Sequence, residues 1–121
     1  MRKLVIFGGS GIGMIAASIA EDLGSHEVIG FLNDVVPVGS DIGRFKKIPV
    51  LGKSEMYKEL LNDSEVDFFI AYVGLQNEKA TFNNIKRIDV PDSRWASLIH
   101  PSAILPREYC EIGKGVLVAP L

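Results

Sequence analysis

The chain of 121 residues has the length of one domain, and its 47% hydrophobic and 23% charged residues are typical of a soluble globular protein rather than a disordered one. Its formal net charge of −2 excludes a strongly basic surface of the kind that attracts nucleic acid or anionic lipid, so we expect neither partner. No apolar run is long enough to cross a bilayer, and the single cysteine, Cys110, excludes an internal disulfide, so we expect a cytoplasmic protein without membrane insertion.

The first part of the chain has the pattern of a βαβ unit. Residues 4–7 form a short apolar run of the kind found in a strand buried on both faces, and it leads into the glycine-rich segment 8–13. Apolar residues then recur on one face of a predicted helix, which Gly24 ends. That face consists of Ile15, Ile19, Ala20 and Leu23. Residues 28–32 predict a second strand, and a right-handed crossover makes the two strands parallel.

The middle of the chain continues this alternation. We expect a short strand over 48–51 inside a loop over 35–53, followed by a helix with Ser54 as its N-cap. The inward face of that helix consists of Tyr57, Leu60 and Leu61. The remaining predicted elements are a strand over 66–73 closed by Gly74, a helix over 76–88 and an apolar stretch over 95–99. The predicted fold class is α/β, a small Rossmann-like parallel sheet flanked by helices.

The glycine-rich turn is the first candidate binding site. A backbone without side chains approaches a phosphate closely, and the helix that follows directs its free N–H groups and positive dipole end at the same point. A dinucleotide fingerprint counted from Gly8 requires glycine at its third position, where this chain has Ser10. The pattern therefore favours a phosphate outside the NAD arrangement, with the Ser10 hydroxyl as a donor. The alternative is a tight turn that needs glycine for packing only.

A second candidate is the pair Asn33-Asp34, which follows the second strand at the same sheet edge as the glycine turn. Asp34 lies 21 residues after Gly13, near where NAD domains carry a ribose-binding acid. The amide and carboxylate are equally suited to the edge of a nucleobase, or to simple turn chemistry. Gly74 belongs to the same edge, either in the site or as a plain strand end. His26 is expected at the opposite edge, in solvent, and the spacing of residues indicates no catalytic or metal-binding group.

The pattern changes from Pro101 onwards, where short apolar residues come at intervals of about six. Residues 112–116 match one hexapeptide, and hexapeptide repetition is typical of a parallel β-helix, in which each coil needs neighbours to bury its faces. We therefore divide the chain into a Rossmann-like domain over 1–100 and the first hexapeptide stub of a left-handed parallel β-helix over 101–121.

Taken in order, these motifs resemble the sialic-acid O-acetyltransferase-like sugar acyltransferases, whose close relatives N-acetylate UDP-4-amino-sugars in bacterial glycan synthesis. The resemblance covers essentially the whole chain. It rests on Gly-Gly-Ser-Gly-Ile-Gly at 8–13, Phe-Leu-Asn-Asp at 31–34, the strand at 67–71, Ser-Leu-Ile-His-Pro-Ser-Ala at 97–103 and the hexapeptide at 112–116.

The resemblance implies a domain that binds a nucleotide-sugar, followed by a β-helix that binds acetyl-CoA and forms a homotrimer. In the UDP-sugar enzymes of the family, matching residues contact the substrate. They are Ser10, Gly11, Ile12, Asn33, Asp34 and Gly74. The catalytic histidine of the family lies in later coils, beyond Leu121. The resemblance therefore predicts that this chain binds the UDP-linked sugar, holds no acetyl-CoA and does not catalyse alone.

The chain departs from the family pattern at three points, which bear on how the nucleotide is recognised. Ile12 stands where the family often has histidine, Asn33 replaces an acid of the usual Asp-Asp pair, and one residue is inserted between Leu105 and Ile112. Two other functions stay open: a stand-alone nucleotide-binding module, and an NAD-binding oxidoreductase fragment, which Asp34 favours and Ser10 disfavours.

Overall fold

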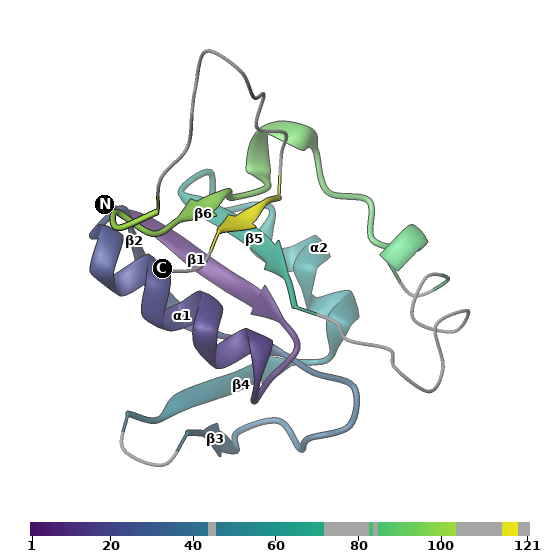
Figure 1. Cartoon of the computed structure of the whole chain (residues 1–121). Helices are drawn as coiled ribbons and strands as arrows, with labels where there is room; N and C mark the ends of the chain where they lie inside the picture. The colour runs from purple at the N-terminus through teal and green to yellow at the C-terminus, as the bar shows by residue number, and fades with distance from the viewer. Residues whose placement is uncertain (44–45, 72–82, 84, 104–114, 119–121) are drawn as a thin grey trace.

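A five-stranded sheet forms the centre of the fold in the computed structural model, which describes residues 1–43, 46–71, 83, 85–103 and 115–118 (Figure 1). The strand order is β3-β4-β2-β1-β5. The strands are β1 (Arg2–Phe7), β2 (His26–Leu32), β3 (Asp41–Ile42), β4 (Ile48–Gly52) and β5 (Val66–Ile70). β3 pairs antiparallel with β4, and the other neighbouring strands run parallel. This confirms the α/β sheet and the parallel pairing of the first two predicted strands.

Helices cover the sheet on both faces. Figure 1 shows α1 (Ile12–Leu23) in front of the sheet and α2 (Tyr57–Leu60), which continues from the 3₁₀ helix η1 (Ser54–Met56), behind it. Alternate residues of β1 serve the two layers: Leu4 and Ile6 pack with α1, whereas Val5 and Phe7 pack with Tyr57. Because successive side chains of a strand point to opposite faces, a continuous apolar run is what a strand between two layers requires.

The face of α1 that packs on the sheet differs in part from the predicted one. Its buried residues are Gly13, Ala16, Ala17, Ile19 and Ala20. Ile15 is 45% exposed, so its predicted inward position is wrong, whereas Ile19 and Ala20 are confirmed. The small side chains bring the helix close to the sheet, where a Cβ on Gly13 would lie 3.2 Å from Cε1 of Phe31. Ile15 lies off this stripe and points outward.

The predicted elements of the middle region are largely present. β4 and β5 confirm the strands expected over 48–51 and from residue 66 onwards, and β5 ends at Ile70. Tyr57 is buried, with Leu60 and Leu61 packed on the same cluster, as predicted. Ser54 makes no side-chain cap, so its predicted N-cap role is wrong. In the helix expected over 76–88, residues 83, 85 and 86 are helical, and residues 76–82 and 84 lie outside the described residues.

The C-terminal part of the described chain crosses back over the domain. It contains the 3₁₀ helix η2 (Asp92–Arg94) and two short strands, β6 (Leu98–Ile99) and β7 (Leu117–Val118). β6 and β7 pair in parallel as a separate sheet, and β6 also contacts α1. Most of the predicted hexapeptide, residues 112–114, lies outside the described residues. None of the helices in the described ranges is both long and apolar enough to span a bilayer.

Candidate functional site

The glycine-rich turn leaves the carboxyl end of β1 and enters α1, at one edge of the parallel sheet. Gly8 donates its N–H to the Leu32 carbonyl at 3.0 Å and has a φ of 134°. A Cβ on Gly8 would lie 2.9 Å from the backbone oxygen of Ala71, next to β5. Glycine is therefore required here by close packing between neighbouring strands. At this position the structure supports the packing interpretation of the glycine pattern.

The next part of the turn faces solvent. Ser10 and Gly11 are exposed, and Ile12 is 39% exposed. Gly11 is the N-cap of α1 with a φ of 76°, and no side chain caps the helix. A Cβ on Gly11 would meet nothing within 4 Å. Because the first N–H groups of a helix have no partner within it, this turn presents open donors and the positive end of the α1 dipole.

Asn33, directly after β2, ties the turn to the following loop. Its Nδ2 donates to the Gly8 carbonyl at 3.1 Å, and its Oδ1 accepts the N–H groups of Val35 and Val36, each at 2.8 Å. A carboxylate could not donate to Gly8, so an amide side chain suits this position better than an acid. Both polar atoms of Asn33 are engaged in this loop, which is the turn chemistry that the sequence left open.

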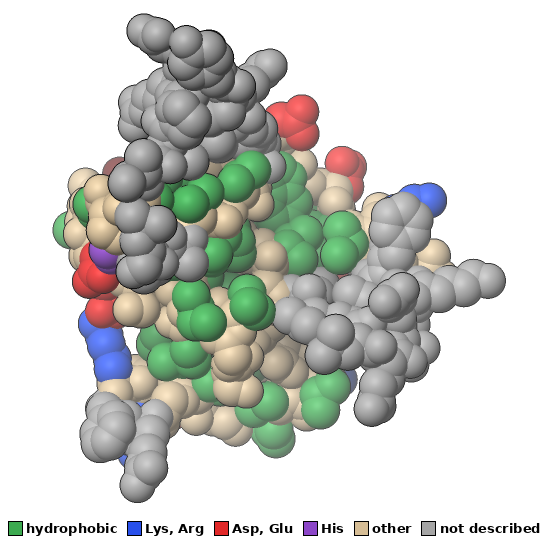
Figure 2. Space-filling model, in the orientation of Figure 1, with side chains coloured by type: hydrophobic (Ala, Val, Ile, Leu, Met, Phe, Trp, Pro, Cys, Tyr) green, Lys and Arg blue, Asp and Glu red, His purple; other side chains and the backbone are tan. Residues whose placement is uncertain are grey.

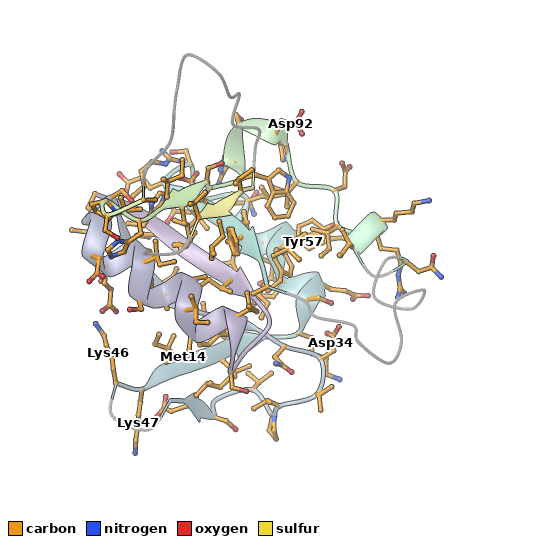
Figure 3. The ribbon with its side chains drawn as sticks, viewed as in Figure 1. Met14, Asp34, Lys46, Lys47, Tyr57 and Asp92 are labelled. Atoms are coloured by element: carbon orange, nitrogen blue, oxygen red, sulfur yellow. The ribbon has the colours of Figure 1, made fainter. Side chains whose placement is uncertain are left out.

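Asp34 lies on the other side of the loop and contacts η1. Its Oδ1 accepts the Ser54 N–H at 2.9 Å, and its Oδ2 accepts the Ser54 hydroxyl at 2.8 Å. The hydroxyl also lies 3.0 Å from Oδ1. The side chain of Ser54 therefore orients the Asp34 carboxylate instead of capping a helix. Figure 3 shows Asp34 beyond the arrowhead of β1.

A pocket of about 640 Å³ opens beside Asp34. Its lining residues are Asp34, Lys53, Ser54, Glu55, Tyr57, Lys58, Arg87 and Ile88. The Tyr57 hydroxyl accepts the Asp89 N–H at 3.2 Å and donates to the Arg87 carbonyl at 3.4 Å, which holds the 87–89 segment against α2. Three cationic side chains and two carboxylates line the pocket, so it offers both donors and acceptors to a polar ligand.

The structure thus brings five of the six predicted site residues to one sheet edge: Ser10, Gly11, Ile12, Asn33 and Asp34. The sixth, Gly74, lies outside the described residues. Sequence reasoning missed the wall of the pocket formed by Lys53, Lys58 and Arg87. Charged residues of a surface helix and a loop are ordinary in sequence, and only the fold of α2 against the 87–89 segment brings these together.

The two histidines lie together at the opposite edge of the sheet. His26 begins β2 and its Nε2 lies 2.8 Å from Oδ2 of Asp67. The His26 side chain is 12% exposed, so its predicted solvated state is wrong. His26 is shielded from solvent because it contacts Asp67 on β5, and the strand order brings Asp67 to the amino end of β2. Among the described residues, no group of three or more His, Cys, Asp or Glu side chains is arranged to hold a metal ion.

Comparison with known families identifies the domain. The profile of the PglD N-terminal domain matches residues 3–89, which include the sheet, α1 and the pocket beside Asp34. The chain belongs to this family. The match confirms the predicted resemblance to the N-terminal part of sugar acetyltransferases.

Solved structures show the same fold. The acetyltransferase domain of PglB from Neisseria gonorrhoeae superposes with a TM-score of 0.70 and 26% identity, over 99% of this chain and 54% of that one. A perosamine N-acetyltransferase from Caulobacter crescentus, solved with CoA and GDP-perosamine, gives a TM-score of 0.69 and 21% identity, over 99% of this chain and 52% of that one. The chain therefore spans about half the length of these similar structures. No curated protein sequence matches it closely enough to count as a relative.

Proposed function

We propose that the chain is the nucleotide-sugar-binding part of an acetyl-CoA-dependent sugar N-acetyltransferase of bacterial glycan synthesis. The observation that carries this proposal is the match of the PglD N-terminal domain to residues 3–89, a range that includes the residues of the open glycine turn and of the Asp34 pocket. Two of the similar structures, one in complex with CoA and GDP-perosamine and one in complex with acetyl coenzyme A, support the class of reaction.

In the proposed complex the diphosphate lies at the exposed turn. Ser10, Gly11 and Ile12 surround the start of α1, where backbone N–H groups and the helix dipole favour an anion. No acidic side chain occupies the first turn of α1 to oppose it. Ile12 supplies only its backbone N–H and an apolar surface here, because its side chain has no polar atom.

The nucleoside then occupies the pocket beside Asp34. A carboxylate has about four acceptor sites, and the Ser54 contacts leave acceptor capacity on Oδ2 for a ribose hydroxyl or a base N–H. Asn33 acts by holding the loop against Gly8. Gly74 stays a proposed substrate contact, as the family resemblance implies. UDP is the nucleotide that the family resemblance implies, and GDP is the one named with the Caulobacter structure.

In the proposal the acetyl-CoA site and the homotrimer contacts belong to the β-helix of the parent protein. The proposed domains of this chain are the Rossmann-like domain over 1–100 and the start of the β-helix over 101–121. The pairing of β6 with β7 supports a β-helix start. Leu98 pairs in parallel with Leu117, 19 residues later. Three hexapeptides take about 18 residues, and the one-residue insertion in the sequence between Leu105 and Ile112 makes 19. A cytoplasmic location belongs to the same proposal.

A thermal-shift titration tests this function. The 121-residue chain is heated with a UDP-linked amino sugar, a GDP-linked amino sugar, or NAD. A ligand at a hundred times its Kd stabilises the fold by about 2.7 kcal/mol, so binding raises the melting temperature measurably. We expect a shift with at least one nucleotide-sugar, abolished in Asp34→Ala and retained in Asp92→Ala, whose exposed carboxylate lies at η2, away from this pocket (Figure 3).

The other outcomes contradict the proposal in distinct ways. A shift with NAD alone favours the oxidoreductase alternative. No shift with either nucleotide-sugar would leave the glycine turn as a packing device and refute the binding site.

A further inference from the structure

A second pocket, of about 470 Å³, lies at the opposite edge of the sheet from the Asp34 pocket. Its polar wall includes Ser25 and both histidines of the described residues, His26 and His100. The apolar wall includes Leu23, Ile99 and Pro101. None of these residues belongs to the nucleotide-sugar site proposed above. A function of this pocket would therefore be separate from that site.

Ser25, His26 and Asp67 form a continuous hydrogen-bonded chain at this pocket. The Ser25 hydroxyl lies 2.9 Å from Nδ1 of His26, and Nε2 of His26 lies 2.8 Å from Oδ2 of Asp67. An ionised carboxylate only accepts hydrogen bonds, so Nε2 carries the imidazole proton and Nδ1 of the neutral ring accepts from the Ser25 hydroxyl. A serine hydroxyl, a histidine base and a carboxylate stand in the same order where a serine is activated as a nucleophile.

Asp67 is held rigidly in this arrangement. It is 7% exposed, and Arg2 donates hydrogen bonds to both of its oxygens, from Nη2 to Oδ1 at 2.7 Å and from Nε to Oδ2 at 2.8 Å. A two-point contact of this kind fixes the carboxylate plane. The carboxylate therefore fixes the tautomer and the orientation of His26, and it is placed to stabilise an imidazolium.

A similar series of hydrogen bonds joins Ser102, His100 and Asp22, but it is less suited to activate a serine. It therefore provides a matched control. Nε2 of His100 lies 2.9 Å from Oδ2 of Asp22, and Nδ1 lies 2.9 Å from the Ser102 hydroxyl. However, Nδ1 also accepts the Ser102 backbone N–H at 3.1 Å. Its lone pair is thus shared with a second donor, and the Asp22 side chain is 57% exposed and screened by water.

We propose that Ser25 is a nucleophile for carboxylic esters with a small apolar acyl group, activated by His26, with Asp67 as a positioning residue. The Ser25 Oγ bonds to the ester carbonyl carbon while its proton passes to Nδ1 of His26. The ester C–O bond then breaks, and the leaving alkoxide takes that proton. Water attacks the acyl-serine, gives one proton to Nδ1, and the released serine oxygen recovers it, so acid and alcohol are the products. The apolar wall accommodates the acyl group.

The test is acylation of the 121-residue chain by p-nitrophenyl acetate, with peptide mass analysis to locate the acetyl group, and labelling by phenylmethylsulfonyl fluoride. We expect one acetyl group on Ser25 and hydrolysis that falls roughly a hundredfold or more in Ser25→Ala. Ser102→Ala should keep the wild-type rate. Ser25 is exposed, so Ser25→Ala is expected to stay folded, which its melting temperature checks.

The role of Asp67 has a separate readout. In Asp67→Asn the labelling rate of Ser25, measured per folded molecule, should fall, because the amide N–H can donate to Nε2 of His26 and move the ring proton to Nδ1, which then no longer accepts from the Ser25 hydroxyl. A purely structural role would lower the fraction folded without changing the labelling rate of the folded molecules. Labelling elsewhere in the chain, or equal hydrolysis by wild type and Ser25→Ala, would overturn the proposal.

Discussion

Asp67 is the only charged residue that is buried in the described part of the chain, and its partners decide its protonation. Desolvation by burial acts to raise the pKa of the Asp67 carboxyl, but hydrogen bonds from Arg2 and His26 outweigh it and hold the pKa below its ordinary value of 3.8. A carboxylate kept ionised in this way joins β1, β2 and β5 at the amino edge of the sheet. The same side chain therefore has a structural role and the positioning role proposed for it above.

The Asp67 network predicts a pH dependence of stability. A pKa that is lower in the folded state than in the unfolded state means that acidification favours unfolding. The contribution of Asp67 is fully present above pH 3.8 or so and is lost as the pH falls through the lowered value. Asp67→Asn should lower the free energy of unfolding at neutral pH by about 1–3 kcal/mol and flatten its decline in acid. Urea unfolding at a series of pH values measures both effects, and parallel pH curves for the two proteins would contradict this account.

At the scale of elements, the turn from β1 to α1 shows how packing and binding share one glycine-rich segment. Gly8 lies against the backbone after β5, whereas Gly11 stands in open space at the start of the helix. α1 approaches the sheet with alanines, and its exposed face carries Ile12 and Ile15. Figure 2 shows hydrophobic side chains across the face of the molecule that carries α1. The glycine-rich segment 8–13 therefore packs into the core at Gly8 and lies at the surface at Gly11.

We therefore expect alanine to lower the free energy of unfolding more at a loop glycine packed against backbone than at one in open space. Gly8→Ala should lower the free energy of unfolding by about 3 kcal/mol, because it combines a strained φ of 134° with a contact of 2.9 Å to the Ala71 carbonyl. Gly39→Ala is the matched control, since Gly39 has a φ of 89° and nothing within 4 Å of an added Cβ. It should cost only the backbone strain, about 1–2 kcal/mol. Equal costs in urea unfolding would show that the close approach to Ala71 does not matter.

At the scale of the whole molecule, the segment after residue 85 is bound to the sheet by Arg94 and Trp95. Arg94 donates to the carbonyls of Val66 and Asp63, each at 2.6 Å, and of Leu61 at 3.3 Å. The Trp95 ring packs against Phe7 and Phe68, with centroid distances of 6.2 and 6.4 Å. These contacts place β6 beside the domain, and hence the point from which the proposed β-helix starts.

Arg94→Lys tests this attachment while the positive charge is kept. A lysine lacks the planar fork that reaches three carbonyls, so partly buried acceptors lose their donors and the free energy of unfolding should fall by about 1–3 kcal/mol. The exposed Lys47 provides the control, because Lys47→Ala should change stability by no more than about 0.5 kcal/mol (Figure 3). An Arg94→Lys protein as stable as wild type, by urea denaturation, would refute the fork as the attachment.

The sequence by itself determined the βαβ start, the strands at 48–51 and from 66, the glycine turn at a sheet edge and the family. Period-two and apolar runs, glycines and hexapeptides are local signals, so neighbouring residues suffice to read them. Only the tertiary structure decided that Ser54 orients Asp34 from 20 residues away, and that Asp67 binds His26 from 41 residues away. Such partners depend on strand order and register, which no local pattern contains. The order sets β2 and β5 on the two sides of β1, and the register brings their residues to the same end of the sheet.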